Sequence, residues 1–118
     1  MRSDSFQWRL FSATLDPALG SEQAGTRPVL VVSREVINQA LPIVAVVPLT
    51  SVKAGRRIYA TEVLFPAGAA GQPDASIALG HQVRTISVRR LGPAYGELTE
   101  PGLRAAVRKA LQVFLDLD

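Results

Sequence analysis

Two short apolar runs constrain the fold of this chain more than any other feature of its sequence. Residues 28–33 and 42–49 are almost uninterrupted by polar side chains, and the second run ends abruptly at Thr50-Ser51. Near-continuous apolar segments of this length are typical of strands buried on both faces. The runs therefore predict two strands of a β-sheet, the first of them central. The polar segment between them, 34–40, is expected to form a turn or one helical turn.

The rest of the chain indicates a mainly β protein that closes with one helix. Four further strands are expected, at residues 6–14, 58–65, 76–79 and 83–87. An exposed turn is expected at 66–74, and one helical turn at 88–91 that Gly92-Pro93 stops. The final helix has Thr99 as its expected N-cap. It carries one apolar stripe, which consists of Leu103, Val107, Leu111 and Phe114.

This order of elements predicts an α+β fold of mainly β character, a small curled β-barrel capped by the C-terminal helix. The chain has 118 residues, which fits one domain with a single core over residues 1–118. No apolar run approaches the roughly 20 residues that a membrane-spanning helix needs. The first residues do not lead into a secretory signal. We therefore expect a cytoplasmic domain without membrane contact.

The composition excludes several kinds of site and leaves the meaning of the basic charge open. The chain has no cysteine, which excludes disulfides, thiolate zinc sites and cysteine nucleophiles, and its single histidine excludes a histidine-rich metal site. The formal net charge is +3, and 11 of the 13 basic residues are arginine. Arginine suits bidentate contact with phosphate and stacking on bases, but a GC-rich genome also favours it. Charge alone therefore favours nucleic acid only modestly.

A polar loop that leads into the first apolar run is the predicted site of function. The segment 20–28 carries two glycines, an acid, an amide, two hydroxyls and an arginine. Loops anchored on rigid strands are where binding and catalytic residues concentrate. Pro28 biases Arg27 toward extended backbone, so the guanidinium is expected to project from the base of the loop.

Three blocks of the sequence, in order and at compatible spacing, resemble the MazF/PemK family of toxins. They are GSEQAGTRPVLVV (20–32), VVPLTS (46–51) and QVRTI (82–86), the last followed by Arg90-Leu91. A helix of the expected length closes the chain. The three blocks together are more specific than a lone short motif, and they cover nearly the whole chain.

This resemblance implies an SH3-like barrel of the CcdB/MazF type that assembles as a two-fold homodimer. It also implies a sequence-specific endoribonuclease that needs no metal or other cofactor, cuts single-stranded mRNA and leaves a 2′,3′-cyclic phosphate and a 5′-hydroxyl. Such an enzyme inhibits translation and growth until a cognate MazE-type antitoxin neutralises it. By position, the family's catalytic residues fall on Arg27 and Thr50. The residues that the resemblance places at the RNA are Ser21, Glu22, Gln23 and Gln82.

The chain departs from the family pattern in two places. A basic-Gly-acidic triplet usually begins the first strand, and Gln7-Trp8-Arg9 stands in its place. Trp8 either stacks on a base or plugs the end of the barrel, and we favour the plug. The loops 52–57 and 66–75 match no fixed pattern. Because these loops would set the sequence preference, the cleavage sequence stays open.

The residues suit RNA cleavage in which the neighbouring 2′-hydroxyl is the nucleophile. Arg27 offers a fixed fork of N–H donors to the oxygens of an anionic phosphorane, and Thr50 adds a hydroxyl. Arginine is a poor base, because deprotonating it at pH 7 costs about 7–9 kcal/mol. Glu22 and His81 are alternative groups for proton transfer. Equally, His81 could contact RNA or solvent, and Glu22 could accept a hydrogen bond from a base or from Arg27.

The remaining basic residues have competing interpretations. Lys53, Arg56 and Arg57 either line a phosphate track or remain solvated. Arg84 is expected to pair with an acid or a carbonyl rather than with RNA. Arg89-Arg90 is expected to be a solvated face, with contact to the antitoxin as the alternative. The apolar stripe of the helix is expected to be core or dimer contact.

Two alternatives to an active ribonuclease remain. A similar fold occurs in CcdB-type toxins, which are non-enzymatic modules that act by contacting DNA gyrase, but these lack the pair formed here by Arg27 and Thr50. A degenerate toxin that only sequesters an antitoxin is supported solely by the altered start at Gln7-Trp8-Arg9. For the active toxin, we expect an acidic, disordered antitoxin tail to fill the groove at Arg27.

Overall fold

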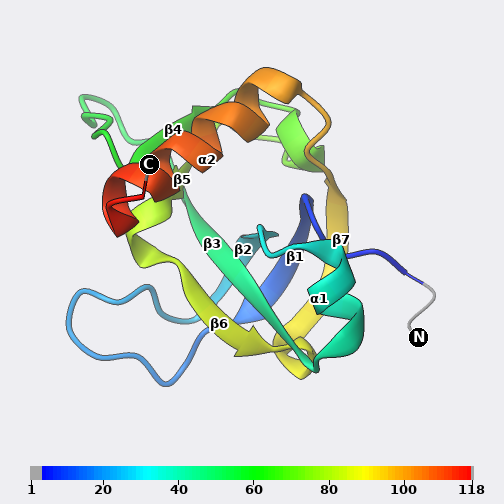
Figure 1. The fold of residues 1–118 in the computed structure, drawn as a ribbon. Helices are drawn as coiled ribbons and strands as arrows, with labels where there is room; N and C mark the ends of the chain where they lie inside the picture. Colours follow the sequence, from blue (N-terminus) through cyan, green and yellow to red (C-terminus); the bar gives the residue numbers. More distant parts are fainter. Residues whose placement is uncertain (1–3, 118) are drawn as a thin grey trace.

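A computed structural model describes residues 4–117 and shows a sheet that curls around its own core, with a helix lying across it (Figure 1). Within the described residues, seven antiparallel strands form the sheet. They are β1 (Arg9–Thr14), β2 (Thr26–Val31), β3 (Ile43–Ser51), β4 (Glu62–Phe65), β5 (Ser76–Leu79), β6 (Arg84–Ser87) and β7 (Leu91–Glu97). The helices are α1 (Glu35–Ala40) and α2 (Pro101–Leu115), with 3₁₀ turns η1 (Ala69–Gly71), η2 (Gly80–Gln82) and η3 (Val88–Arg90).

Strand β3 is the centre of the sheet and pairs with three others. It pairs with β2 over Val46–Pro48, with β6 over Ile43–Val46 and with β5 over Leu49–Ser51. The full order is β4-β5-β3-β2-β1-β7, with β6 on β3 beside β5. Both strands predicted from the apolar runs are thus confirmed, and the uninterrupted apolar pattern follows from burial on both faces.

The sheet curls strongly but does not close, because its two edge strands, β4 and β7, do not pair with each other over the described residues. The turn η1 packs against β7 at the open side. A Cβ atom on Gly71 would lie 2.4 Å from the carbonyl oxygen of Tyr95, and one on Gly96 would lie 2.9 Å from that of Ala70. Glycine is therefore required at both positions for the two backbones to approach. The predicted curled barrel with a C-terminal helix is confirmed in this open form.

The apolar side chains form two clusters, one on each face of the central strands. Alternation along β2 directs Leu30 into one cluster and Val29 and Val31 into the other. The first cluster, which includes Phe65, is covered by α2 through Val107. The second cluster consists mainly of strand residues, and its members are Phe11, Ala13, Leu15, Val29, Val31, Val44, Val46 and Ile86.

Three predictions about strands and turns are wrong in part. Strand β7 was not expected, because Gly92-Pro93 indicated a stop; as an edge strand paired only with β1, β7 accepts a proline. The strand expected from residue 58 begins only at Glu62. The turn at 66–74 is not wholly exposed, since Ala69 and Ala70 are buried where η1 packs against β7.

The C-terminal helix also differs from expectation at both ends. Its N-cap is Glu100 rather than Thr99, and Pro101 opens the helix. The Thr99 amide and hydroxyl both donate to the Glu100 carboxylate, at 3.1 Å each. At the other end the apolar stripe leaves the core, because Phe114 is 45% exposed and its neighbour Val113 is equally so.

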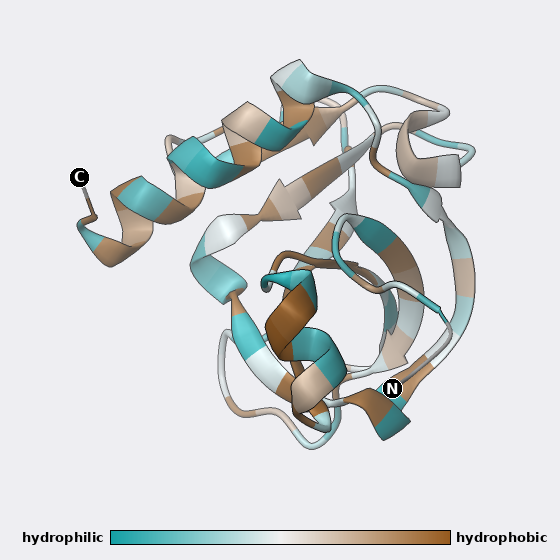
Figure 2. Cartoon of the chain, turned by 45° about the vertical axis from the view of Figure 1, so that its right-hand side comes forward, coloured by the Kyte–Doolittle hydropathy of each residue, from teal (hydrophilic) through white to brown (hydrophobic). Residues whose placement is uncertain are grey.

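Two groups of apolar side chains remain on the surface. One lies on α1 and the start of β3, where Figure 2 shows a strongly hydrophobic segment of α1, and consists of Val36, Ile37, Leu41 and Ile43. The other lies at the end of α2 and consists of Val113, Phe114, Leu115 and Leu117. Among the described residues, no helix is long and apolar enough to cross a membrane.

Trp8 is buried at the junction of β1 and α2, which confirms the interpretation as a plug. Two guanidinium groups of α2 lie over its ring, with Arg104 Cζ 5.3 Å and Arg108 Cζ 5.0 Å from the ring centroid. Its backbone has φ of +66°, in the left-handed region that favours glycine. The glycine of the family triplet is therefore explained by this backbone, and the chain accepts tryptophan there because the ring is buried under α2.

Trp8→Gly should be less destabilising than Trp8→Ala, the reverse of the usual order. Loss of the buried ring lowers the free energy of unfolding by about 3–5 kcal/mol in Trp8→Ala. Glycine removes the left-handed strain of about 1–2 kcal/mol, so Trp8→Gly should recover about 1 kcal/mol of that loss. Denaturant unfolding of both variants measures the difference. Phe11, buried within β1, is the control, and there the alanine variant should be more stable than the glycine variant. The same order at Trp8 would contradict the explanation.

Candidate functional site

The loop between β1 and β2 is tied at its base and projects from the sheet (Figure 1). The Leu15 amide donates to the carbonyl of Gly25 at 2.9 Å, and the Gly25 amide donates to the Asp16 carboxylate at 2.9 Å. Two arginines, from β6 and η3, hold the first residues of the loop. Arg84 Nη1 donates to the carbonyl of Leu15 at 3.1 Å, and Arg90 Nη1 donates to that of Asp16 at 2.7 Å. Both ends of the loop are therefore tied down by hydrogen bonds.

These contacts decide two of the open interpretations. Arg84 pairs with a carbonyl, as predicted. Arg90 is not part of a solvated face, because its guanidinium also donates to the carbonyl of Thr14 at 3.2 Å. Only Arg89 of that pair is exposed.

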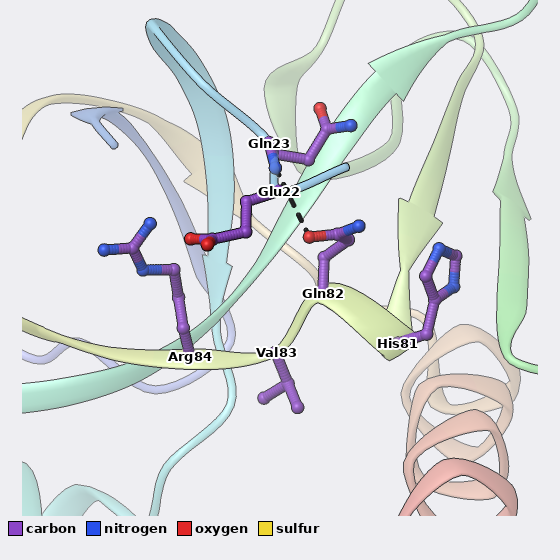
Figure 3. Close-up of a pocket in the computed structure, with 6 residues that line it drawn as sticks. All are labelled: Glu22, Gln23, His81, Gln82, Val83 and Arg84. Atoms are coloured by element: carbon purple, nitrogen blue, oxygen red, sulfur yellow. Dashed lines mark hydrogen bonds between the residues drawn. The ribbon is translucent and has the colours of Figure 1, made fainter. Parts of the chain in front are cut away.

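Gln82 clamps the tip of the loop from η2 (Figure 3). Its Oε1 accepts from the amide of Gln23 at 3.3 Å, and its Nε2 donates to the carbonyl of Ser21 at 3.0 Å. One side-chain amide thus satisfies both a backbone donor and a backbone acceptor, a use that requires an amide side chain. The resemblance placed Gln82 near the RNA groove, and the structure adds that it positions the loop.

Arg27 and Thr50 meet where β2 and β3 separate. The last pair of the ladder is Val29 with Pro48, and continuing this register by two residues places Arg27 opposite Thr50. Both line a hollow of about 110 Å³ that Gln72 and Ser76 also line. Arg27 Nε donates to the carbonyl of Ala24 at 2.8 Å, which fixes the stem of the side chain. Arg27 lies within β2 rather than in the loop before it.

Two larger hollows continue from Thr50 along the loop. One of about 470 Å³ joins Thr50 to Gln23 and His81, and another of about 350 Å³ joins His81 to Glu22 (Figure 3). Neighbouring hollows share lining residues, so we describe the three together as one groove. We call this the groove and define it by Ser21, Glu22, Gln23, Arg27, Thr50, Lys53, Arg56, His81, Gln82 and Arg84.

Four basic side chains and one acid line the groove, so it suits a polyanion. The cations are Arg27, Lys53, Arg56 and Arg84, and the acid is Glu22. No group of three or more histidine, cysteine or acidic side chains that could hold a metal ion occurs within residues 4–117.

A buried acid, Glu62, lies beneath the basic wall of the groove. Arg56 donates through both terminal nitrogens to its carboxylate, at 3.1 Å and 2.8 Å, and the amide of Tyr59 donates at 3.0 Å. His81 Nδ1 lies 4.0 Å from the same carboxylate and 3.1 Å from the hydroxyl of Thr61. The bonds from Arg56 lower the pKa of Glu62 below its ordinary value of 4.5, and the same bonds raise the pKa of Arg56.

The structure brings together every residue that the sequence placed at the RNA except Arg57. That side chain is exposed, and its guanidinium lies 5.8 Å from the ring centroid of Tyr59. Sequence reasoning missed Glu62, because an acid in an alternating strand indicates a solvent-facing position. The signal that could have found it is Arg56, six residues earlier across the loop.

The fold and the groove define a small β protein with a basic groove along one face of its sheet. A sequence model of the family described as "PemK-like, MazF-like toxin of type II toxin-antitoxin system" matches residues 7–115. The chain therefore belongs to the PemK-like, MazF-like toxin family.

Relatives and solved structures agree with this membership. Endoribonuclease EndoA of Bacillus subtilis (strain 168) is 33% identical over 108 residues, covering 92% of this chain and 91% of its own. Endoribonuclease MazF9 of Mycobacterium tuberculosis (strain ATCC 25618 / H37Rv) is 34% identical over 113 residues, covering 92% and 93%. The structure of the Mycobacterium tuberculosis toxin MazF-mt6 superposes with a TM-score of 0.74 at 31% identity, covering 93% of this chain and 98% of that one. These matches favour the RNA-cleaving interpretation over the gyrase-binding one.

Glu62→Gln should lower stability at neutral pH and flatten its acid dependence. Since the pKa of Glu62 is depressed in the folded state, its stabilisation is complete above pH 4.5 and is lost as pH falls through the lower folded-state value. The variant should lose about 1–3 kcal/mol at pH 7, and the deficit should shrink toward pH 3. Denaturant unfolding at several pH values measures this. Glu97→Gln, which removes an exposed acid 3.0 Å from Arg104, is the control and should cost under about 1 kcal/mol.

Proposed function

We propose that residues 1–118 act as one toxin domain, a metal-independent endoribonuclease that cleaves single-stranded mRNA at specific sequences. The observation that carries the proposal is the single hollow that Arg27 and Thr50 both line, at one end of a basic groove. Membership of the toxin family and the endoribonuclease names of the relatives support it. The toxin acts in the cytoplasm, where mRNA is translated, and inhibits translation and growth.

The reaction uses the substrate's own 2′-hydroxyl. Its oxygen forms a bond to the neighbouring phosphorus while the bond from phosphorus to the 5′-oxygen breaks, leaving a 2′,3′-cyclic phosphate and a 5′-hydroxyl. Arg27, held at Nε by the carbonyl of Ala24, directs its terminal nitrogens to the non-bridging oxygens of the phosphorane. Thr50 donates its hydroxyl to the same anion. Both groups stabilise charge that grows only in the transition state.

Proton transfer needs a group other than Arg27, since removing its proton at pH 7 costs about 7–9 kcal/mol. Glu22 and His81 supply a carboxylate and an imidazole at the groove. The loop residues Ser21 and Gln23, held by Gln82, contact the bases and the backbone of the RNA. The rates of Glu22→Gln and His81→Gln identify the proton-transfer group.

Arg27→Ala should abolish cleavage of RNA without unfolding the protein. Loss of one oxyanion donor lowers kcat by about 10²–10³-fold, and the side chain is not part of the core. The protein is incubated with single-stranded RNA in EDTA, and the new 5′ ends are mapped to give the cleavage sequence. Arg89→Ala, which removes an exposed arginine outside the groove, is the control and should cleave normally. Absence of cleavage by the wild type, or full activity of Arg27→Ala, would contradict the proposal.

The partners of this toxin are a second copy of the chain and a MazE-type antitoxin. The apolar group at the end of α2, which includes Phe114 and Leu117, is the surface for the homodimer. An acidic, disordered antitoxin tail occupies the groove at Arg27 and folds there, because its carboxylates replace the phosphates of RNA. Inhibition of the enzyme then follows from competition for one basic surface.

Saturating antitoxin should therefore raise KM for RNA without lowering kcat at saturating substrate. A tail fragment containing only the acidic segment should inhibit in the same way, and the inhibition should weaken as salt is increased. Steady-state cleavage with a fluorogenic oligoribonucleotide measures both effects. If saturating antitoxin leaves the cleavage rate unchanged at RNA concentrations below KM, the assignment of the tail to the groove is overturned.

A further inference from the structure

We propose that Glu62 is a positioning residue of the groove, and that the Arg56 it holds forms a subsite for a backbone phosphate next to the one that is cleaved. Neither the family's catalytic pair nor the clamped loop includes this acid. The proposal rests on the proposed RNA cleavage and names how the same groove holds its substrate beyond the reacting phosphate.

The register of the sheet places Glu62 on the same face as Thr50. Thr50 pairs with Ile77 on β5, and Leu79, two residues further along β5, pairs with Glu62 on β4. Directly paired residues share a face of the sheet, as do residues two apart on one strand. Two strand spacings of about 4.8 Å and two residue steps of about 3.3 Å separate Thr50 from Glu62 by about 12 Å. The acid therefore lies beyond the cleavage centre, under the same groove.

Both carboxylate oxygens of Glu62 contact residues beside the groove. Its side chain is 2% exposed. One oxygen accepts from both Arg56 and the amide of Tyr59, and the other accepts from Arg56 and lies 4.0 Å from His81 Nδ1. A buried ion pair adds little net stability compared with apolar packing. We infer that the pair instead serves to orient the Arg56 guanidinium.

Arg56 keeps donors for an anion after these contacts. Nη1 donates to Glu62 and to the carbonyl of Arg57, and Nη2 donates once to Glu62, which uses three of the five N–H groups. The Nε–H and the second N–H of Nη2 have no acceptor within residues 4–117. The guanidinium lines the hollow that also contains Thr50, Lys53 and His81. A phosphate in this hollow meets a preoriented guanidinium rather than a mobile one.

His81 lines the same hollow as Arg56 and lies beside Glu62. Its Nδ1 lies 3.1 Å from the hydroxyl of Thr61, and the Gly80 amide at the start of η2 donates to the carbonyl of Thr61 at 2.9 Å. This approach requires glycine, because a Cβ on Gly80 would lie 2.5 Å from that carbonyl oxygen. The ring is therefore fixed by the same strand end that carries Glu62. Its other nitrogen, Nε2, is available to the substrate.

The test compares steady-state cleavage by the wild type, Glu62→Gln, Arg56→Gln and the double variant on the mapped oligoribonucleotide at several salt concentrations. Each single variant should raise KM about tenfold with little change in kcat, which is the size expected for one charge-assisted hydrogen bond. The double variant should be no worse than Arg56→Gln. The slope of log KM against log salt should fall by about 0.7 in each, as for one lost phosphate contact to single-stranded RNA.

If Glu62 acted only through its charge, Glu62→Gln would lower KM instead of raising it, because the variant removes a negative charge from an anion-binding groove. An unchanged or lower KM in Glu62→Gln, or a higher KM with the wild-type salt slope, would overturn the proposal. Glu97→Gln carries the same charge change outside the groove and should match the wild type. If thermal unfolding shows that Glu62→Gln is unfolded, Arg56→Lys replaces it in the test, because lysine keeps the positive charge and loses the forked N–H donors of arginine. A wild-type KM in Arg56→Lys would then overturn the proposal. A wild type that does not cleave RNA overturns the proposed function instead.

Discussion

The pairing of β3 with three strands fixes the position of every part of the groove. Its middle is bound to β2, and its two halves are bound to β6 and β5 on the other side. Where β2 and β3 separate, Arg27 and Thr50 line one hollow. Where β5 ends, η2 begins, and its Gln82 reaches back to the loop that precedes β2. The groove is thus assembled on a buried strand, and hydrogen bonds from η2 and β6 hold its loop.

The sequence contained this scaffold because it is encoded locally. The apolar runs that become β2 and β3 need no knowledge of their partners, since strands buried on both faces are uniformly apolar. Arg27 was indicated by the polar loop before the first run, and the resemblance to the toxin family added Thr50, at the end of the second run, and the catalytic role of both. What the sequence alone could not provide is the register of Val29 with Pro48, which is the fact that turns two separate residues into one site.

The features that were missed all depend on distant contacts. Strand β7 contains Gly92-Pro93 and lies at an edge of the sheet, so neither hydrophobic alternation nor proline position distinguished it from a turn. The burial of Ala69 and Ala70 arises only when η1 meets that strand. Glu62 is buried because Arg56 folds back onto it, and the pattern of β4 alone indicates a solvent-facing acid. In each case the deciding partner lies outside the local pattern.

The altered start of the chain does not weaken the case for an active toxin. Gln7-Trp8-Arg9 replaces the family triplet, and this change was the sole support for a degenerate toxin. Trp8 belongs to the apolar cluster under α2, which Leu30 enters from β2, whereas the register places Arg27 on the opposite face, in line with Val29. The backbone strain at Trp8 is thus offset by packing against Arg104 and Arg108, away from the groove. Trp8 packs against one face of the sheet and Arg27 lies on the other. The residue at position 8 can therefore vary while the groove is retained.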